Sequence, residues 1–405
     1  MIHPRPAPLT CALLLVASAV LVPLPASAAE PLPASGRYLP LYPGLYLDLT
    51  LSQDERDRVF DANGDERDSA LPNYRNGVAF PEQRLDAAFT WTFPLFERDA
   101  VPFLSSRLHT ARVQLGLIRN DTEGPLAAYI AGRDDYRIDG SGVGDLQLEF
   151  GSYLWGSGGW RGREAPARAS GLLLLGLTIP TGVYEHEAPI NAGSNQAALH
   201  ATLGAHWQPW AGSRIEAGYR YRAHRRNEQP QFGALAPTER GDDQRLDLSL
   251  MQRVHRSISA GLMFTALRGA ANVYEHPLDA PNAPPPPDTT PPSDRFPTLG
   301  RYRDEGTALQ TLALALEAYP SQRLRARLAW LHPLSGESGE FDLPFTNRQP
   351  AGCIDGALGC QTREGDTVRV DGLGPARAYA SDSLQLSLTY QFGQGDPYTC
   401  TGCRR

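Results

Sequence analysis

The sequence predicts an all-β fold, a transmembrane antiparallel up-and-down β-barrel of about twelve strands with long external loops and mostly short periplasmic turns. Two observations lead to this prediction. Segments of about ten residues alternate strictly between apolar and polar side chains, and the connectors between them alternate in length. Because successive side chains of a strand point to opposite faces, each segment has one apolar and one polar face. In a membrane barrel the apolar face contacts lipid and the polar face lines the interior.

The alternation is clearest in the last segment, residues 384–392, where Leu, Tyr and Phe alternate with Gln, Ser and Thr. Residues 215–222, 245–250 and 324–330 repeat it with charged side chains on the polar face. Eight similar segments begin near residues 45, 84, 111, 145, 172, 197, 258 and 308. The polar faces also contain small residues, as expected where side chains crowd a narrow interior. These are Gly116, Gly151, Gly204 and Gly218.

The connectors differ in length on the two sides of the predicted barrel. Short ones follow the sixth, eighth and tenth strands: 208–212, the surroundings of residue 255, and 320–323. Long ones follow odd strands: 52–83, 120–142, 227–241, 271–305 and 336–381. Outer-membrane barrels have short periplasmic turns and long external loops, so the connector lengths predict which end of the barrel faces the periplasm. Two further periplasmic connectors, 94–106 and 156–168, are longer than this rule predicts.

Aromatic residues gather near the predicted periplasmic strand ends. Aromatic rings favour the headgroup region of a bilayer, where membrane barrels have aromatic girdles. We therefore expect a periplasmic girdle formed by Trp91, Phe93, Tyr153, Trp155, Trp207, Tyr319 and Phe392.

The first residues predict export. Arg5 precedes an apolar run from residue 11 to residue 22, and Ala26-Ser27-Ala28 forms a small-residue cleavage site. The run is too short to span a bilayer, and no later stretch of about 18 apolar residues offers a transmembrane helix. The expected organisation is a cleaved secretory signal peptide at 1–28, an outer-membrane barrel at 29–392 and a periplasmic tail at 393–405. The expected location is the Gram-negative outer membrane.

Charge limits the partners. The formal net charge is −7, whereas a nucleic-acid surface needs a basic face, so no nucleic-acid partner is expected. All 38 lysine and arginine positions hold arginine. A GC-rich genome explains this composition; the alternative is that guanidinium groups suit paired charges inside a narrow pore. The expected partners are outer-membrane lipid, a small-molecule solute and, during biogenesis, the barrel-assembly machinery.

The polar faces also predict which residues line the lumen. Buried charges must be paired to be tolerated, so these side chains would form either a salt-bridged plug or a polar conduit whose arginines favour anionic or hydrogen-bonding solutes. Both arrangements can hold in different layers. The predicted lining residues are Arg112, Asp145, Glu149, Glu216, Arg220, Arg222, Arg245, Asp247, Arg325 and Arg327.

Four cysteines remain after signal removal. Cys353 and Cys360 fall in an external loop, whereas Cys400 and Cys403 follow the last strand and are periplasmic. The membrane would separate the two pairs, which argues against one shared zinc site. Two local disulfides are expected in an oxidising compartment.

Neither candidate metal motif predicts a metal site. Residues 61–65 begin with the spacing of a calcium loop, but Glu66 occupies its glycine position and Pro72 its bidentate carboxylate position. Asn63-Gly64 fits a tight hairpin turn better. Glu185-His186-Glu187 fits a solvated loop, because neighbouring residues of a strand point to opposite faces. No metal or cofactor is expected.

Three short motifs carry a family resemblance. They are Gly142-Val143-Gly144-Asp145, Ile179-Pro180-Thr181-Gly182-Val183-Tyr184 and Asn191-Ala192-Gly193-Ser194-Asn195. With these three motifs in this order, the chain resembles the outer-membrane family labelled MetA-pathway of phenol degradation. The resemblance covers most of the mature chain and is strongest from residue 141 to 254. The resemblance implies a transporter-like, porin-like barrel and brings no catalytic residues.

We therefore expect an outer-membrane channel or transporter for small solutes, among them aromatic or weakly hydrophobic compounds. One alternative is a structural or loop-binding barrel with a plugged lumen. Another is an outer-membrane lipid hydrolase, which needs a nucleophile and a base near the lipid-facing surface. Because His200, His206 and His224 fall in the inward phase, enzyme activity is not expected.

Overall fold

The computed structural model describes residues 44–54, 58–68, 82–93, 108–122, 138–139, 141–155, 169–184, 192–228, 238–275, 301–321, 323–344, 367–371 and 378–392. Their regular secondary structure consists of strands, and none of them forms a helix long and apolar enough to cross a bilayer. The predicted signal peptide, the tail and all four cysteines of the mature chain lie outside these ranges.

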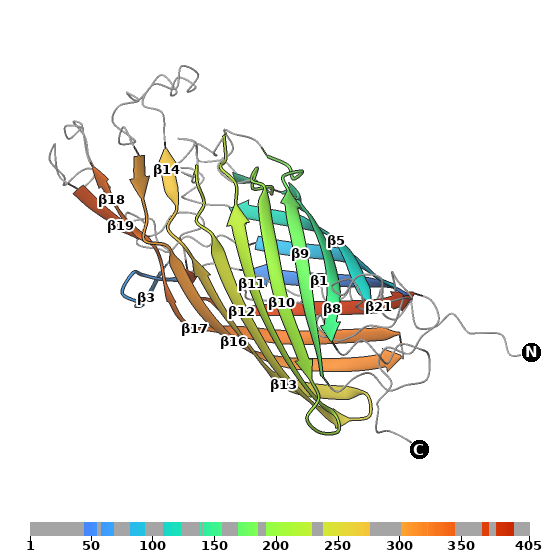
Figure 1. Cartoon of the computed structure of the whole chain (residues 1–405). Coiled ribbons are helices and arrows are strands. Elements are labelled where there is room, and N and C mark those ends of the chain that lie inside the picture. Colours follow the sequence, from blue (N-terminus) through green and yellow to red (C-terminus); the bar gives the residue numbers. More distant parts are fainter. Residues whose placement is uncertain are drawn as a thin grey trace, which may run out of the picture.

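Twelve strands form a closed antiparallel barrel, as the alternation predicts (Figure 1). Each pairs with its neighbours along the chain, and β1 closes the ring by pairing with both β21 and β4. The strands are β1 (Gly44–Asp54), β4 (Glu82–Phe93), β5 (His109–Thr122), β8 (Leu146–Trp155), β9 (Ala169–Ile179), β10 (Ala198–Trp207), β11 (Ser213–His224), β12 (Asp243–His255), β13 (Ile258–Gly269), β16 (Thr307–Ser321), β17 (Leu324–Glu337) and β21 (Ser383–Phe392).

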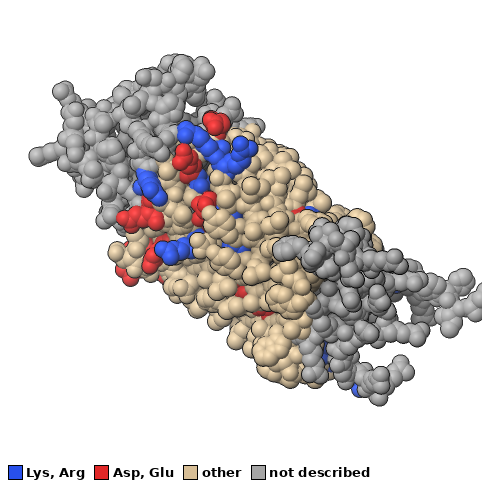
Figure 2. Space-filling view, viewed as in Figure 1, with Lys and Arg blue, Asp and Glu red and all other residues tan. Residues whose placement is uncertain are grey.

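Burial alternates along the strands. In β12 every second residue from Asp243 to Met251 is buried, while Leu246, Leu248 and Leu250 between them are exposed. The buried side chains face the barrel interior, and the exposed apolar ones form the surface that contacts lipid. Figure 2 shows this surface largely free of charge, with charged side chains gathered toward the end that bears the long connectors.

The two ends of the barrel differ as predicted. Tight turns join β10 to β11 and β12 to β13 at one end, and Gly212 adopts a left-handed φ of 75° in the first of them. At the other end the long connectors contain short strands of their own (Figure 1). These are β2 (Arg58–Phe60), β3 (Glu66–Asp68), β6 (Ile138–Asp139), β7 (Gly142–Val143), β14 (Val273–Glu275), β15 (Arg301–Arg303), β18 (Glu340–Pro344), β19 (Thr367–Asp371) and β20 (Ala378–Tyr379).

The β2–β3 hairpin confirms the turn predicted at Asn63-Gly64. Asp61 Oδ1 accepts hydrogen bonds from the backbone N–H groups of Asn63 and Asp65, at 2.8 and 3.0 Å. Gly64 has a left-handed φ of 84°, which glycine adopts at little cost. The Asp61 carboxylate thus closes a turn.

This hairpin, together with β20, folds over the inner wall at the external mouth. Phe60 is 3% exposed and packs with Leu309, Ala378 and Ala380. Ser338 fixes it there, because its hydroxyl donates to the Phe60 carbonyl and accepts from the backbone N–H of Ala378. Part of the first external loop therefore lines the entrance.

The aromatic girdle is confirmed in part. Outward rings at the periplasmic strand ends are about half exposed, among them Trp91 at 55%, Trp155 at 52% and Trp207 at 53%. The prediction was wrong for two tyrosines. Tyr153 is 1% exposed in an inner apolar cluster, and Tyr319 donates a hydrogen bond to the buried Glu317 at 2.8 Å. Their strand phase turns both rings inward.

Candidate functional site

The candidate site is the barrel interior. Nine of the ten predicted lining residues lie on the inward face of a barrel strand: Arg112, Glu149, Glu216, Arg220, Arg222, Arg245, Asp247, Arg325 and Arg327. Whether they line an open conduit stays a prediction. Sequence reasoning missed further inward charges, chiefly Asp48, Arg214, Asp243 and Glu317. Arg214 shares the phase of Glu216, so extending the alternation by one step would have found it.

The tenth residue, Asp145, is placed differently from the other nine. It lies in the break between β7 and β8, where its carboxylate accepts hydrogen bonds from the backbone N–H of Gly182 at 3.1 Å and of Ser194 at 2.9 Å. The three motifs of the family resemblance therefore meet at one point. We call this the Asp145 clamp: residues 142–145, 180–184 and 192–196.

Glycine is required inside the Asp145 clamp. A Cβ on Gly182 would lie 2.6 Å from Gly193 Cα, and one on Gly193 would lie 2.8 Å from the Gly182 backbone. Beside them Tyr184 contacts Asn227 and Asn195; burial raises the pKa of its phenol, and those two hydrogen bonds partly oppose the rise. The clamp joins two external connectors, β5–β8 and β9–β10, by close backbone contacts that only glycine permits.

One register row carries alternating charges around the wall. Arg112 Nε lies 4.0 Å from Glu149 Oε2, and His200 Nε2 lies 3.1 Å from Glu149 Oε1. Because the strands are staggered, the row starts near the turn end of β5 and reaches the long-loop end of β12. We call it the charge row: Arg112, Glu149, Gly176, His200, Arg222 and Asp243, each a register partner of the next.

Gly176 makes the contact between His200 and Glu149 possible. These two side chains come from β10 and β8, with β9 between them. The His200 ring lies over Gly176, where an added Cβ would come within 2.0 Å of the ring nitrogen Nε2. The missing side chain gives the imidazole its path across β9.

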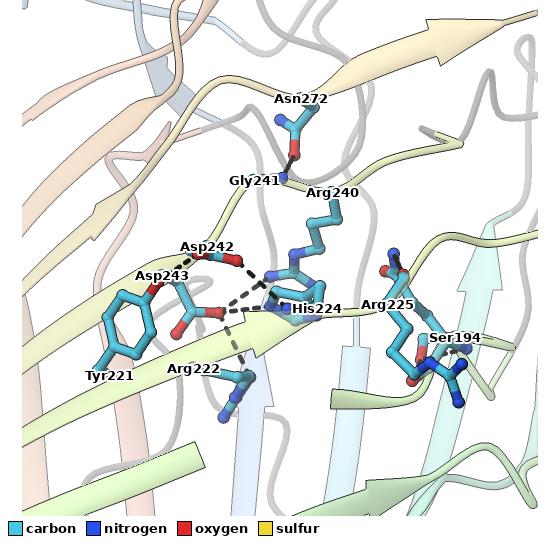
Figure 3. A network of polar contacts seen from close by, with 11 residues as sticks. Ser194, Tyr221, Arg222, His224, Arg225, Arg240, Gly241, Asp242, Asp243 and Asn272 are labelled. Atoms are coloured by element: carbon cyan, nitrogen blue, oxygen red, sulfur yellow. Dashed lines mark hydrogen bonds and ion pairs between the residues drawn. The ribbon is translucent and has the colours of Figure 1, made fainter. Parts of the chain in front are cut away.

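At the external end of the charge row, donors surround Asp243 (Figure 3). His224 Nε2 lies 2.9 Å from its carboxylate, Arg222 3.7 Å and Arg240 3.9 Å. The neighbouring Asp242 accepts a hydrogen bond from the Tyr221 hydroxyl. This network gives the external part of the row a fixed geometry.

A second set of charged side chains forms an ion pair across the interior near the periplasmic end. Arg214 Nη2 on β11 lies 2.8 Å from both oxygens of Glu317 on β16, with β12 and β13 between them in the barrel order. Glu317 is fully buried, and Arg327 beside it is 1% exposed. Arg327 donates to Ser387 Oγ at 3.4 Å and approaches Met263 Sδ at 3.7 Å. At this level the described side chains pack against one another.

The wall from β12 to β17 also carries an apolar patch beside these charged residues. Its inward side chains form a buried cluster, which we call the apolar strip: Met251, Met263, Ala313, Ala315, Ala329 and Leu331. The charge row runs along β5 to β12, mostly on the other part of the ring. The interior is thus amphipathic: the apolar strip gives β12 to β17 a patch of carbon surface among charged side chains, and the charge row offers hydrogen bonds and charge mostly on β5 to β11.

Among the described residues no group of three His, Cys, Asp or Glu side chains is arranged to hold a metal ion. The residues Glu185-His186-Glu187 lie outside the described ranges, as do the cysteines. The two disulfides, Cys353–Cys360 and Cys400–Cys403, stay predictions.

The family described as "Putative MetA-pathway of phenol degradation" matches residues 100–271. This confirms the predicted resemblance, and the matched range contains all three motifs. It spans less than the resemblance implied, which was most of the mature chain. No curated protein sequence matches the chain.

Among solved structures, an outer-membrane channel from Pseudomonas putida F1 is similar with a TM-score of 0.54 and 14% identity, over 90% of this chain and 100% of that chain. At this identity the likeness shows the shared barrel fold. The NanC porin follows with a TM-score of 0.38 and 7% identity, over 85% of this chain and 100% of that chain. The β domain of the Bordetella autotransporter BrkA has a TM-score of 0.37 and 11% identity, over 86% and 100%.

Proposed function

We propose that this protein is an outer-membrane channel for small solutes that combine a weakly hydrophobic body with a hydrogen-bonding group. The observation that supports this is the division of the interior into the charge row and the apolar strip. A solute on this path can keep its carbon skeleton against one wall while the other replaces its lost water contacts. The similar barrel from Pseudomonas putida F1 is described as an outer-membrane channel, and the matching family is described by a pathway of phenol degradation; both agree with this proposal.

The competing proposal is a plugged barrel that only holds its loops. The pair Arg214–Glu317 and the buried Arg327 favour it, because a closed layer of paired charges stabilises a barrel without conducting. The channel proposal requires this layer to open at least transiently. The two proposals therefore differ in conductance.

A lipid hydrolase is the third possibility to be tested. The structure brings His109 Nδ1 within 2.8 Å of Ser152 Oγ at the turn end of β5 and β8. Phe93 and Phe150 flank the His109 ring, which is fully buried. We expect no phospholipid hydrolysis by the purified barrel, because the two phenylalanines cover the imidazole that would have to act as the base. Hydrolysis that disappears in Ser152→Ala would support the enzyme instead.

The test of the channel proposal is conductance of the refolded full-length chain in planar bilayers. A steady ohmic current is expected. The identified inward arginines and carboxylates are similar in number, so the anion-to-cation permeability ratio should lie near one. Changing Arg220 and Arg222 to Ser should make the pore cation-selective, whereas Arg268→Ser on the outward face should not.

Two results would decide against the channel. A barrel that is demonstrably folded, by heat-modifiable migration in gels, but passes no current would support the plugged barrel. A current whose selectivity changes equally in the inward double variant and in the outward control would mean that these arginines do not line the path.

A further inference from the structure

Three inward arginines meet on β11 and β12, in the external half of the barrel. Arg220 and Arg245 are register partners, so two like charges stand directly opposite each other. Arg222 lies two residues further along the same face. Like charges directly opposite on neighbouring strands destabilise a sheet, because their Cβ atoms are only about 5 Å apart. The fold therefore tolerates a local concentration of positive charge here.

The carboxylates beside these arginines already have partners. Asp247 accepts from Arg245 Nε at 2.8 Å and from Thr265 Oγ1 at 2.9 Å. Asp243 is held by Arg222, His224 and Arg240, as described above. With Arg240 included, guanidinium groups outnumber these carboxylates, so an added anion would meet a favourable field.

A second, independent feature points to a ligand. Thr202 on β10 is the register partner of Arg220 and is 1% exposed. Its hydroxyl has no hydrogen-bond partner within the described part of the chain. Buried hydroxyl groups normally form hydrogen bonds. A buried hydroxyl without one, next to an arginine, indicates a position where a ligand can accept its hydrogen bond.

The same register row supplies apolar neighbours. It runs from Leu174 through Thr202, Arg220 and Arg245 to Leu267, and then to Leu309 on β16. In the next row toward the periplasm Gly204 stands opposite Gly218, so the wall adds no side chain beneath Thr202 and Arg220. The site thus combines charge, a hydroxyl donor and carbon surface within a few residues.

We infer that Arg220, Arg245 and Thr202 form a binding site for a small organic carboxylate, a site that rests on the proposed channel function and names its substrate class. The two guanidinium groups bind the carboxylate oxygens, and the Thr202 hydroxyl donates a further hydrogen bond. Leu174 and Leu267 contact the apolar part of the solute. Binding of the anion relieves the repulsion between the two arginines.

The test is equilibrium binding of benzoate to the full-length protein in lipid nanodiscs, measured by calorimetry with empty nanodiscs as the blank. Benzyl alcohol has the same ring without the charge, and inorganic phosphate has charge without the ring. Benzoate should bind at least about tenfold more tightly than either probe, since benzyl alcohol lacks the carboxylate and phosphate lacks the apolar ring.

Variants separate binding from folding. Arg220→Gln should weaken benzoate binding by about tenfold or more, and Thr202→Val by roughly three- to tenfold. Thr202→Val keeps the shape of the side chain and breaks no described hydrogen bond, so it should fold as the parent does. Arg84→Gln is the matched control, because Arg84 is an inward arginine paired with Asp86 on another part of the wall; its affinity should be unchanged.

The site is disproved if the parent protein shows no saturable benzoate binding, or if benzyl alcohol binds equally well. Equal weakening by the Arg84 control and the Arg220 variant would also disprove it, since binding would then follow general charge. A barrel that conducts but binds no benzoate would refute this site and leave the channel standing. A barrel that binds benzoate but never conducts would refute the channel and leave the site.

Discussion

Replacing Gly176 by Ala is the sharpest test of the charge row. The added methyl carbon would lie 2.0 Å from His200 Nε2 and 2.4 Å from Cε1, far inside van der Waals contact. The contacting atoms belong to a side-chain ring, so the imidazole can swing away while the backbone stays in place. It cannot then keep its 3.1 Å hydrogen bond to Glu149, because the path across β9 is blocked.

The expected loss of stability follows from the loss of the hydrogen bond between His200 and Glu149. Glu149 is 8% exposed and His200 is 5% exposed, so water replaces neither partner well. A hydrogen bond to a charged buried group contributes about 1.5–3 kcal/mol, and displacing the ring adds about 1 kcal/mol or more from crowding. We expect Gly176→Ala to lower the free energy of unfolding by about 3 kcal/mol.

The assay is reversible urea unfolding of the barrel in lipid vesicles, followed by tryptophan fluorescence. Gly269→Ala is the matched control, because its nearest neighbour would lie 4.0 Å from the added carbon, and it should change stability by less than about 0.5 kcal/mol. In a His200→Ala background the Gly176 change should cost about 1 kcal/mol or less. The reasoning fails if Gly176→Ala matches the Gly269 control, or if its cost is undiminished when the ring is absent.

Three further changes test other parts of the interior. Glu317→Gln should destabilise the barrel by about 3 kcal/mol in the same assay, because the buried Arg214 loses its closer carboxylate while Glu216 stays at 3.6 Å. Changing Arg214 and Glu317 together to apolar residues should restore part of the loss; an unchanged midpoint would show that the pair is not needed. Asp145→Asn should raise the rate of proteolysis in the external connectors, because an amide cannot accept every hydrogen bond in the clamp, and equal rates would contradict the clamp. Phe60→Ala should raise conductance by loosening the hairpin over the mouth, and an unchanged current would mean that the hairpin does not restrict entry.

Much of the fold could be predicted because alternation is a local property. The apolar and polar faces of a strand can be assigned from its own residues. The inward direction of Glu216, Arg220 and Arg222 therefore followed from the residues next to them. The twelve strands and the orientation of the barrel followed in the same way from counting segments and connectors. Errors arose at strand ends: Arg214 lies just outside the predicted segment 215–222, and Tyr153 and Tyr319 were expected at the lipid interface. At a strand end, an error of one residue in the assumed alternation reverses the direction predicted for a side chain.

The charge row, the crossing pair and the carboxylate site needed the tertiary structure. Arg214 and Glu317 are 103 residues apart, and no local pattern indicates that their side chains meet. Sequence alone determined which face of the wall the mid-strand residues occupy. Height along the barrel axis depends on the stagger between neighbouring strands, which is set jointly by all twelve pairings when the ring closes. That closure places Gly176 beneath His200 and Thr202 opposite Arg220.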